Sequence, residues 1–304
     1  MQSKTIKKNI ESKMNEWIQS ITNEELRKEL KSNILVSGGS IASMFLNETV
    51  NDYDVYIKDK NVLLKLVEYY CKPQNIEIFD GDKKEEYLKI IADAYKLKNV
   101  EEVDDIVFNR RKIAISNLHE GQVKLNVGSG IKVNQEAKED LKYIPKFFSP
   151  NAISLSDQIQ IVCRFSGDDV SIHKTFDFIH ATNFFTYELG LVTNKESLES
   201  LIIKQLKYQG SLYPLTSIIR MKKFIKRGWN INAGEILKIM YQISELDLND
   251  PNVLEEQLIG VDVAYFGTLI EIIRGLPPTF KMTVAYLGAL IDKVFNSHED
   301  EVIE

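Results

Sequence analysis

The sequence predicts an α+β domain over residues 1–193, followed by an α-helical domain over 194–304. Two observations predict this division. Up to Thr186, helical patterns are interspersed with short apolar or alternating runs typical of strands, whereas from about Lys195 one helical pattern follows another. The length agrees, because 304 residues suffice for two domains of about 150 residues each.

The N-terminal segment predicts two helices and then a strand, a turn, a helix and a second strand. The expected elements are a helix before residue 20, a helix from 23, a strand at 34–36, a turn at 37–40, a helix at 41–46 and a strand at 51–57. The last of these alternates strictly, so Asp52 and Asp54 are expected on one face, and Val55 and Ile57 on the other.

The remainder of the first domain is expected to complete the sheet around a charged helical insertion near 82–107. Other expected elements are a helix at 60–70, strands at 112–116, 123–127 and 153–165, and an aromatic, strand-rich stretch at 175–186. In the second domain, helices are expected around 198–206, from Pro214 to Gly228, from Pro251, at 263–274 and at 279–295.

Composition excludes several classes of protein. The net charge of −6 excludes a uniformly basic nucleic-acid binder, and 44% hydrophobic residues are typical of a globular chain. Two cysteines, Cys71 and Cys163, are too few for a disulfide framework. No apolar run approaches the roughly 18 residues of a membrane span, and no signal peptide is recognisable at the N-terminus. We therefore expect a soluble protein of the cytoplasm.

The segment that carries chemistry is the turn with Gly38, Gly39 and Ser40, followed by Asp52 and Asp54. Paired glycines before a helix let backbone N–H groups approach a phosphate, and the helix N-terminus favours its charge. The Ser40 hydroxyl can bind the same phosphate. Two aspartates two residues apart on a strand lie on one face, where their oxygens can share a hard cation such as Mg²⁺.

This order of strand, Gly-Gly-Ser turn, helix and Asp-x-Asp strand resembles the DNA polymerase β-like nucleotidyltransferase superfamily over residues 34–57. The phrases NDYDVYI, FDFIHATNFF and KFIKRGWNINAG also resemble predicted nucleotidyltransferases of tailed bacteriophages. The resemblance implies a nucleotidyltransferase-type mixed sheet flanked by helices. It implies the host cytoplasm as the location, if the chain is phage-encoded.

The superfamily resemblance implies a third carboxylate on a strand next to the Asp-x-Asp strand. Asp177 between two phenylalanines fits best, with Asp80 and Glu77 as rivals. Three carboxylates imply two Mg²⁺ ions, which would neutralise the site and clamp an in-line displacement. Asp52 and Asp54 would then hold the metal on a triphosphate, while Asp177 would serve the second metal or take the acceptor's proton.

A basic stretch lies between residues 204 and 234, which carry seven cationic side chains and no acidic one. It is either a solvated helix face or a cationic wall for triphosphate or a nucleic-acid backbone. In the resembled superfamily, a Lys and a Ser or Tyr of the helical domain hold the triphosphate. Lys204, Lys207 and Tyr208 are the candidates here, and the two lysines would share a helix face.

The expected activity is therefore Mg²⁺-dependent transfer of NMP from an NTP to a hydroxyl, with release of pyrophosphate. The acceptors, in order of preference, are an RNA 3′ end, a protein side chain and a small molecule. Two alternatives stay open at this point. The fold can serve as a non-catalytic nucleotide- or RNA-binding regulatory module, or it can synthesise a nucleotide second messenger.

Overall fold

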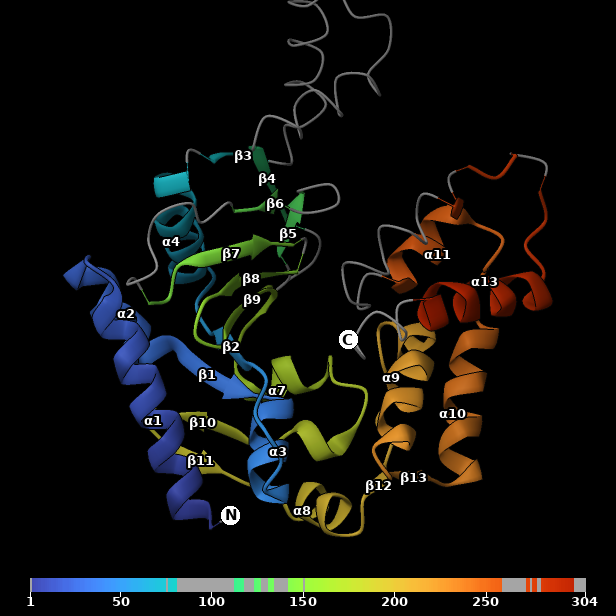
Figure 1. Ribbon diagram of the computed structural model, residues 1–304, viewed down its shortest axis with the longest axis horizontal. Coiled ribbons are helices and arrows are strands. Elements are labelled where there is room, and N and C mark those ends of the chain that lie inside the picture. The colour runs from blue at the N-terminus through green and yellow to red at the C-terminus, as the bar shows by residue number, and fades with distance from the viewer. Residues whose placement is uncertain are drawn as a thin grey trace, which may run out of the picture. The chain divides into compact units, whose positions relative to one another are not determined.

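The computed structural model describes residues 2–74, 76–80, 112–117, 123–126, 131–133, 142–149, 151–258, 272–273, 275–277 and 280–297. They belong to two units, Met1–Ile203 and Lys204–Glu304 (Figure 1). The division lies ten residues after the predicted boundary at 193 (203 − 193), because helix α8 (Lys195–Ile202) belongs to the first unit. The predicted insertion at 82–107 lies outside the described residues, as does most of 263–274.

The first unit is built on a mixed sheet of eight strands in the order β11-β10-β1-β2-β9-β8-β7-β6. The strands are β1 Ile34–Ser37, β2 Tyr53–Ile57, β6 Ile131–Lys132, β7 Pro145–Phe148, β8 Ala152–Leu155, β9 Ile159–Ser166, β10 Phe184–Thr186 and β11 Gly190–Val192. Strand β1 pairs antiparallel with both β10 and β2, whereas β2 and β9 are parallel. The prediction of an α+β fold with a mixed sheet is confirmed.

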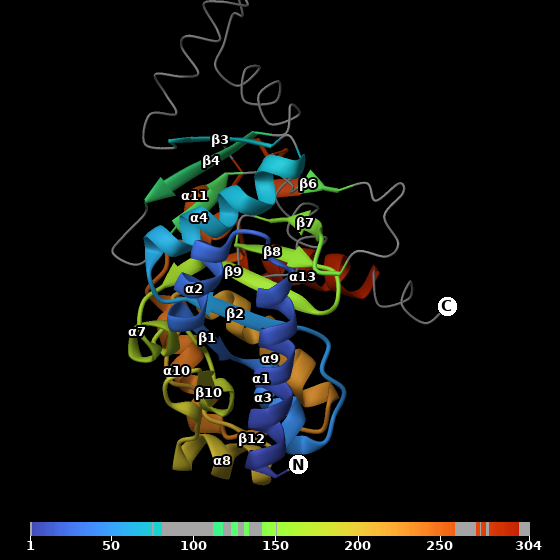
Figure 2. The same ribbon diagram turned by 90° about the vertical axis from the view of Figure 1, so that its left-hand side faces the viewer.

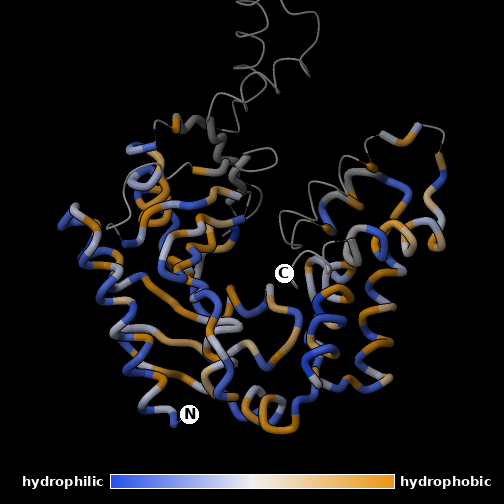
Figure 3. Tube along the Cα trace, viewed as in Figure 1, coloured by the Kyte–Doolittle hydropathy of each residue, from blue (hydrophilic) through white to orange (hydrophobic). Residues whose placement is uncertain are grey.

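Helices cover one face of this sheet, as the N-terminal periodicity predicts. They are α1 Ser3–Ser20, α2 Glu24–Asn33, α3 Gly39–Leu46 and α4 Lys60–Cys71. Their buried residues form one core with alternate residues of the central strands, including Ile34 and Val36 of β1 and Val55 and Ile57 of β2. Figure 2 shows α1 and α2 against the sheet, and Figure 3 shows hydrophilic and hydrophobic residues alternating along α1.

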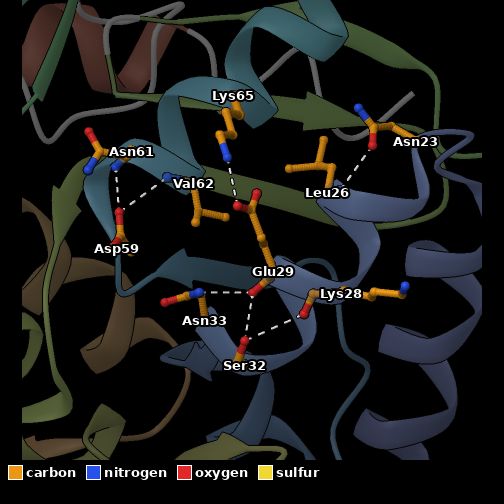
Figure 4. A network of polar contacts seen from close by, with 10 residues as sticks. All are labelled: Asn23, Leu26, Lys28, Glu29, Ser32, Asn33, Asp59, Asn61, Val62 and Lys65. Atoms are coloured by element: carbon orange, nitrogen blue, oxygen red, sulfur yellow. Dashed lines mark hydrogen bonds and ion pairs between the residues drawn. The ribbon is translucent and has the colours of Figure 1, made fainter.

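Polar contacts fix the ends of these helices. Asn23 caps α2 by accepting a hydrogen bond from Leu26 N (3.0 Å), and Asp59 caps α4 by accepting one from Asn61 N (2.7 Å). Glu29 of α2 pairs with Lys65 of α4 (2.6 Å) (Figure 4). Each cap satisfies helix N–H groups that have no partner inside the helix, which explains where both helices begin.

The opposite face of the sheet bears a smaller apolar cluster, here called the second-face cluster. It contains Leu35, Tyr56, Ile172 and Phe184, with Phe176 packed against it. Helix α7 (Asp169–His173) supplies Ile172, so the chain after β9 returns across this face. Leu35 and Tyr56 alternate with the residues of the main core, which means that the predicted alternation of β2 is correct.

A second sheet in the first unit consists of β3 Glu77–Asp80, β4 Lys112–Asn117 and β5 Val123–Asn126. Strand β3 is parallel to β4, and β4 is antiparallel to β5. The predicted strands at 112–116 and 123–127 are confirmed to within one residue.

Two strand predictions need correction. The run at 153–165 is a hairpin of β8 and β9, whose chain reverses at Asp157 and Gln158 with φ of 57° and 63°. The stretch at 175–186 is strand only at 184–186; before that it contains a bend and the short helix η3 (Ile179–Ala181). Its aromatic residues therefore do not alternate along a strand.

The second unit is mainly helical. Its helices are α9 Pro214–Lys226, α10 Ala233–Ser244, α11 Pro251–Leu258 and α13 Val284–Ser297, with short parallel strands β12 Gln205–Leu206 and β13 Asn230–Ile231. Pro214 opens α9 as predicted, and Gly228 follows it with φ of 80°. The predicted helix at 198–206 ends at Ile202. No helix among the described residues is long and apolar enough to cross a membrane.

Candidate functional site: the Gly38 turn and Asp54

The turn between β1 and α3 has the conformation that its glycines predict. Gly38 stands immediately before α3 with φ of 91° and ψ of −150°, a region that residues with a Cβ rarely adopt. Its backbone N–H donates to Ala181 O (3.1 Å). The turn is thus held from outside by the chain near η3.

The structure brings Asp54 against this turn. Ser37 and Asp54 are partners in the β1–β2 register, so the carboxylate lies beside the residue that follows Ser37. A Cβ placed on Gly38 would lie 3.0 Å from Asp54 Oδ2. Only glycine leaves room for the carboxylate at this distance. The structure therefore places the Asp54 carboxylate beside the Gly38 turn.

Gly39 and Ser40 begin helix α3 and have different surroundings. A Cβ on Gly39 would meet nothing within 4 Å, so there is open space beside it. The side chain of Ser40 is buried, and among the described residues its hydroxyl has no hydrogen-bond partner. Since the first amide groups of a helix also lack intrahelical partners, this helix start offers donors for an anion.

Asp52 lies just before β2 and is exposed, whereas Asp54 is half-buried within the strand. Both carboxylates offer oxygen ligands of the kind that Mg²⁺ prefers.

The two strands next to β2 carry no carboxylate. At the level of Asp54, β1 has Ser37 and β9 has Gln160. Asp177 lies in a bend between α7 and η3 and not on a strand, which corrects the expectation from the sequence. The two flanking phenylalanines resemble a strand pattern in the sequence, but each has its own packing partner. Phe176 packs on Tyr56 (ring centroids 5.9 Å apart), and Phe178 packs on His180 (6.2 Å).

Asp177 is buried, and the segment that contains it packs on the face of β2 that bears Asp54. However, no three Asp, Glu, His or Cys side chains of the described residues form a group that could hold a metal ion. The expected pair of Mg²⁺ ions stays a prediction. Asp80 and Glu77 both lie on β3, in the separate sheet, and their side chains fall outside the description.

A partly buried hydrogen bond that sequence reasoning missed joins β1 to α7. Ser37 Oγ lies 2.8 Å from His173 Nε2, and 3.0 Å and 3.2 Å from the carbonyl oxygens of Asn183 and Ala181. Because the hydroxyl has a single hydrogen to donate to a carbonyl, we assign Nε2–H of His173 as the donor to Ser37. Burial lowers the pKa of His173, which favours the neutral ring.

The contacts continue into a polar network around η3. The Asn183 side chain donates to Ser197 Oγ (2.8 Å), which donates to His180 O (3.0 Å). Asn194 donates through its side chain to Thr182 Oγ1 (2.7 Å) and accepts from Ser197 N (2.6 Å). This network fixes the chain whose Ala181 carbonyl holds Gly38. The sequence signal available for the hydrogen bonds of Ser37 was its position directly before the glycines of the turn.

The candidates Lys204, Lys207 and Tyr208 belong to the second unit. Lys204 has φ of 47° and its carbonyl accepts from Asn230 N (2.8 Å), so the chain has left the helix and the two lysines do not share a helix face. Tyr208 is buried, with its hydroxyl bonded to Gln242. The role of all three in holding a triphosphate stays a prediction.

Comparison with known families gives the chain its relatives. The model of the Gabija anti-defense 2 family matches residues 8–204, which is more than half of the chain and includes the whole Gly38 and Asp54 region. The chain belongs to the Gabija anti-defense 2 family. A curated relative, "Gabija anti-defense 2" of Bacillus phage SPbetaL7, is 21% identical over 251 residues, which are 82% of this chain and 47% of the relative. The chain thus spans about half the length of this family member.

Some solved structures resemble the chain at lower sequence identity than this relative does. The Thermotoga maritima CCA-adding enzyme complexed with tRNA is 12% identical, with 89% of this chain and 57% of that one covered at a TM-score of 0.37. A tRNA-processing enzyme in an apo form is 11% identical, with 95% and 65% covered and a TM-score of 0.37. The Bacillus stearothermophilus CCA-adding enzyme in complex with CTP is 9% identical, with 86% and 57% covered and a TM-score of 0.35.

Proposed function

We propose that this chain is a nucleotidyltransferase of the DNA polymerase β-like type, whose nucleotide phosphates bind at the Gly38 turn. The observation that supports it most is the placement of the Asp54 carboxylate against the glycine turn that opens α3. Hydrogen-bond donors for phosphate and a carboxylate that can bind a cation then lie next to each other. This is the combination that transfer from an NTP needs.

In this proposal each residue of the site has a separate task. The helix start at Gly39 and the buried Ser40 hydroxyl donate hydrogen bonds to phosphate oxygens. Asp52 and Asp54 would hold Mg²⁺, which would neutralise phosphate charge when bound. The acceptor oxygen bonds to the α-phosphorus as the bond to pyrophosphate breaks. Asp177, whose segment packs on the same face, is the proposed acceptor of the hydroxyl proton.

The family name supports a biological role for the transfer. We propose that the reaction counters the bacterial defence named Gabija during phage infection, within the host cytoplasm. An RNA 3′ end is the first acceptor to test, followed by a protein of the defence system. If the role holds, co-expression of the chain should restore phage plaques on cells that carry this defence, and the inactive variant described next should not.

The activity is tested by incubating the purified protein with each α-³²P-labelled NTP, Mg²⁺, and either total RNA or cell lysate. Asp52→Asn with Asp54→Asn should lower label transfer by about 100-fold or more, since both metal-binding charges are lost while the shapes persist. Glu188→Gln is the matched control, because it removes an exposed carboxylate from the same unit. Equal transfer by the double variant and the wild type would refute the mechanism.

A non-catalytic alternative has one specific observation in its favour, which is the lack of a carboxylate on both neighbours of β2. A nucleotide binder of this kind would take up NTP with Mg²⁺ in calorimetry and release no pyrophosphate with any acceptor. Steady pyrophosphate release by the purified wild type, abolished by the double variant, would eliminate this alternative.

A further inference from the structure

A cavity in the second unit lies between α10 and the loop after β12. Its volume is about 710 Å³, within the usual range of small-molecule sites. Residues 208–210 of the loop and 234, 237, 238, 241 and 242 of α10 line it. All of its lining belongs to the second unit, whereas the Gly38 turn belongs to the first.

Hydrogen bonds hold the walls of this cavity in place. Tyr208 N donates to Glu235 Oε2 (2.7 Å), while Tyr208 Oη and Ser211 N (3.3 Å) both bond to Gln242 Oε1. These contacts fix the loop on α10 and set the orientation of the Gln242 amide. The cavity is therefore formed before any ligand arrives, which reduces the entropy cost of binding.

The donors in the cavity favour a ligand with hydrogen-bond acceptors. The Gln242 oxygen is occupied twice, and among the described residues no hydrogen bond uses its amide nitrogen. Lys238 contacts both oxygens of Glu235 (2.9 Å and 3.1 Å), which compensates that carboxylate and leaves the ammonium a further donor.

Two exposed hydrophobic side chains lie beside these donors in the lining of the cavity. Leu237 and Tyr241 are four residues apart on α10, so they lie on one side of the helix, and each is 66% exposed. An exposed tyrosine ring next to amide and ammonium donors suits a planar ring with acceptor atoms on its edge. Nucleobases have this combination, for example the adjacent O6 and N7 of guanine, whereas aromatic side chains of proteins lack it.

We propose that this cavity binds a nucleobase, presented either by a free nucleotide or by a single-stranded RNA. The stacking surface is formed by Leu237 and Tyr241, and the base edge is bound by Gln242 and Lys238. This site requires no phosphate contact, so it differs in chemistry from the Gly38 turn. The inference does not depend on catalysis in the first unit.

The test is calorimetry of the full chain with the four ribonucleosides, which have no phosphate, and with a short single-stranded oligoribonucleotide. Gly234→Trp should fill the cavity, because a Cβ there meets nothing within 4 Å and Gly234 lies in the first turn of α10. We expect it to abolish binding, and Tyr241→Ala to weaken binding about tenfold or more. Gly234→Ala, Asp54→Asn and Ile225→Ala, which lies on another helix, should leave binding unchanged.

Thermal unfolding of each variant checks that the second unit remains folded. Binding of nucleosides would show that a base on a free nucleotide is enough for binding. Binding of the oligonucleotide alone would identify an RNA strand as the ligand. Either result supports a base site if Gly234→Trp abolishes the binding. Absence of binding in both arms would overturn the proposal. So would binding that a folded Gly234→Trp variant retains.

Discussion

Two segments of the first unit meet at the Gly38 turn, and different contacts hold each of them. The segment from β1 to β2 is local: Gly38 and Asp54 are sixteen residues apart (54 − 38) and are aligned by one antiparallel register. The segment from α7 to β10 is distant in sequence. Its contacts to Ser37 span 136 to 146 residues and consist of hydrogen bonds that are partly or fully buried.

The local segment supplies groups that can bind a ligand, and the contacts of the distant segment with Ser37 and Gly38 support them. The local segment contributes the carboxylate and the phosphate donors, which is why a short sequence pattern identifies it. The distant segment contributes carbonyl groups and a neutral histidine that hold the turn in place. Variants of Gly39, Asp52 and Asp54 should therefore affect ligand binding directly. Variants that break the contacts between Ser37 and the distant segment should act through stability. Asp177, the proposed proton acceptor, is the exception within the distant segment.

The largest change in stability is expected for Gly38→Ala. A Cβ at φ of 91° is strained, and it would lie 3.0 Å from Asp54 Oδ2. We expect a loss of about 1–3 kcal/mol in the free energy of unfolding, measured by urea titration. Gly39→Ala is the matched control in open space, and at a helix position it should be neutral or slightly stabilising. Equal stability of the two variants would contradict the described turn.

Ser37→Ala removes the link between the two segments. It leaves Nε2 of the half-buried His173 and a carbonyl of the distant segment without this partner, so we expect a loss of about 1–3 kcal/mol in the free energy of unfolding. Ser32→Ala is a suitable control, since Ser32 is exposed and bonds only to carbonyls of its own helix. If the control were as destabilising as Ser37→Ala, the link would have no special role.

The smallest effect is a pH dependence of stability. Burial lowers the pKa of His173 in the folded protein below its ordinary value of 6.5. Below pH 6.5 the unfolded chain therefore binds more protons than the folded one, and stability falls as the pH decreases. His173→Gln should reduce this fall between about pH 6.5 and 5, measured as the change in urea midpoint. An unchanged slope would show that His173 does not titrate differently on folding.

Sequence patterns were sufficient where the contacts are local. The helical spacing of Ile6 and Ile10, the alternation of β2 and the glycines of the turn each follow from chain periodicity or backbone conformation. The turn and Asp54 could therefore be predicted together. Because this part of the site depends on one strand pair, no distant contact is needed to infer it.

The remaining features depend on tertiary contacts that no local pattern encodes. The aromatic residues around Asp177 suggested a strand. They belong to a bend instead, and Phe176 and Phe178 pack against different rings. The spacing of Lys204 and Lys207 predicted a shared helix face. That prediction is wrong because the chain turns at Lys204, where φ is positive. The bond between Ser37 and His173 joins residues 136 positions apart, so only the folded chain reveals it.

The central claim is that the start of α3 receives the phosphates of a nucleotide. It is tested most directly by calorimetric titration of tripolyphosphate with Mg²⁺ into the wild type and Gly39→Ala. The methyl group enters the open space beside the helix start without disturbing the fold. The account predicts binding by the wild type and a loss of about tenfold or more in Gly39→Ala at unchanged stability. Equal affinity of the two proteins, or no binding by the wild type, would contradict it.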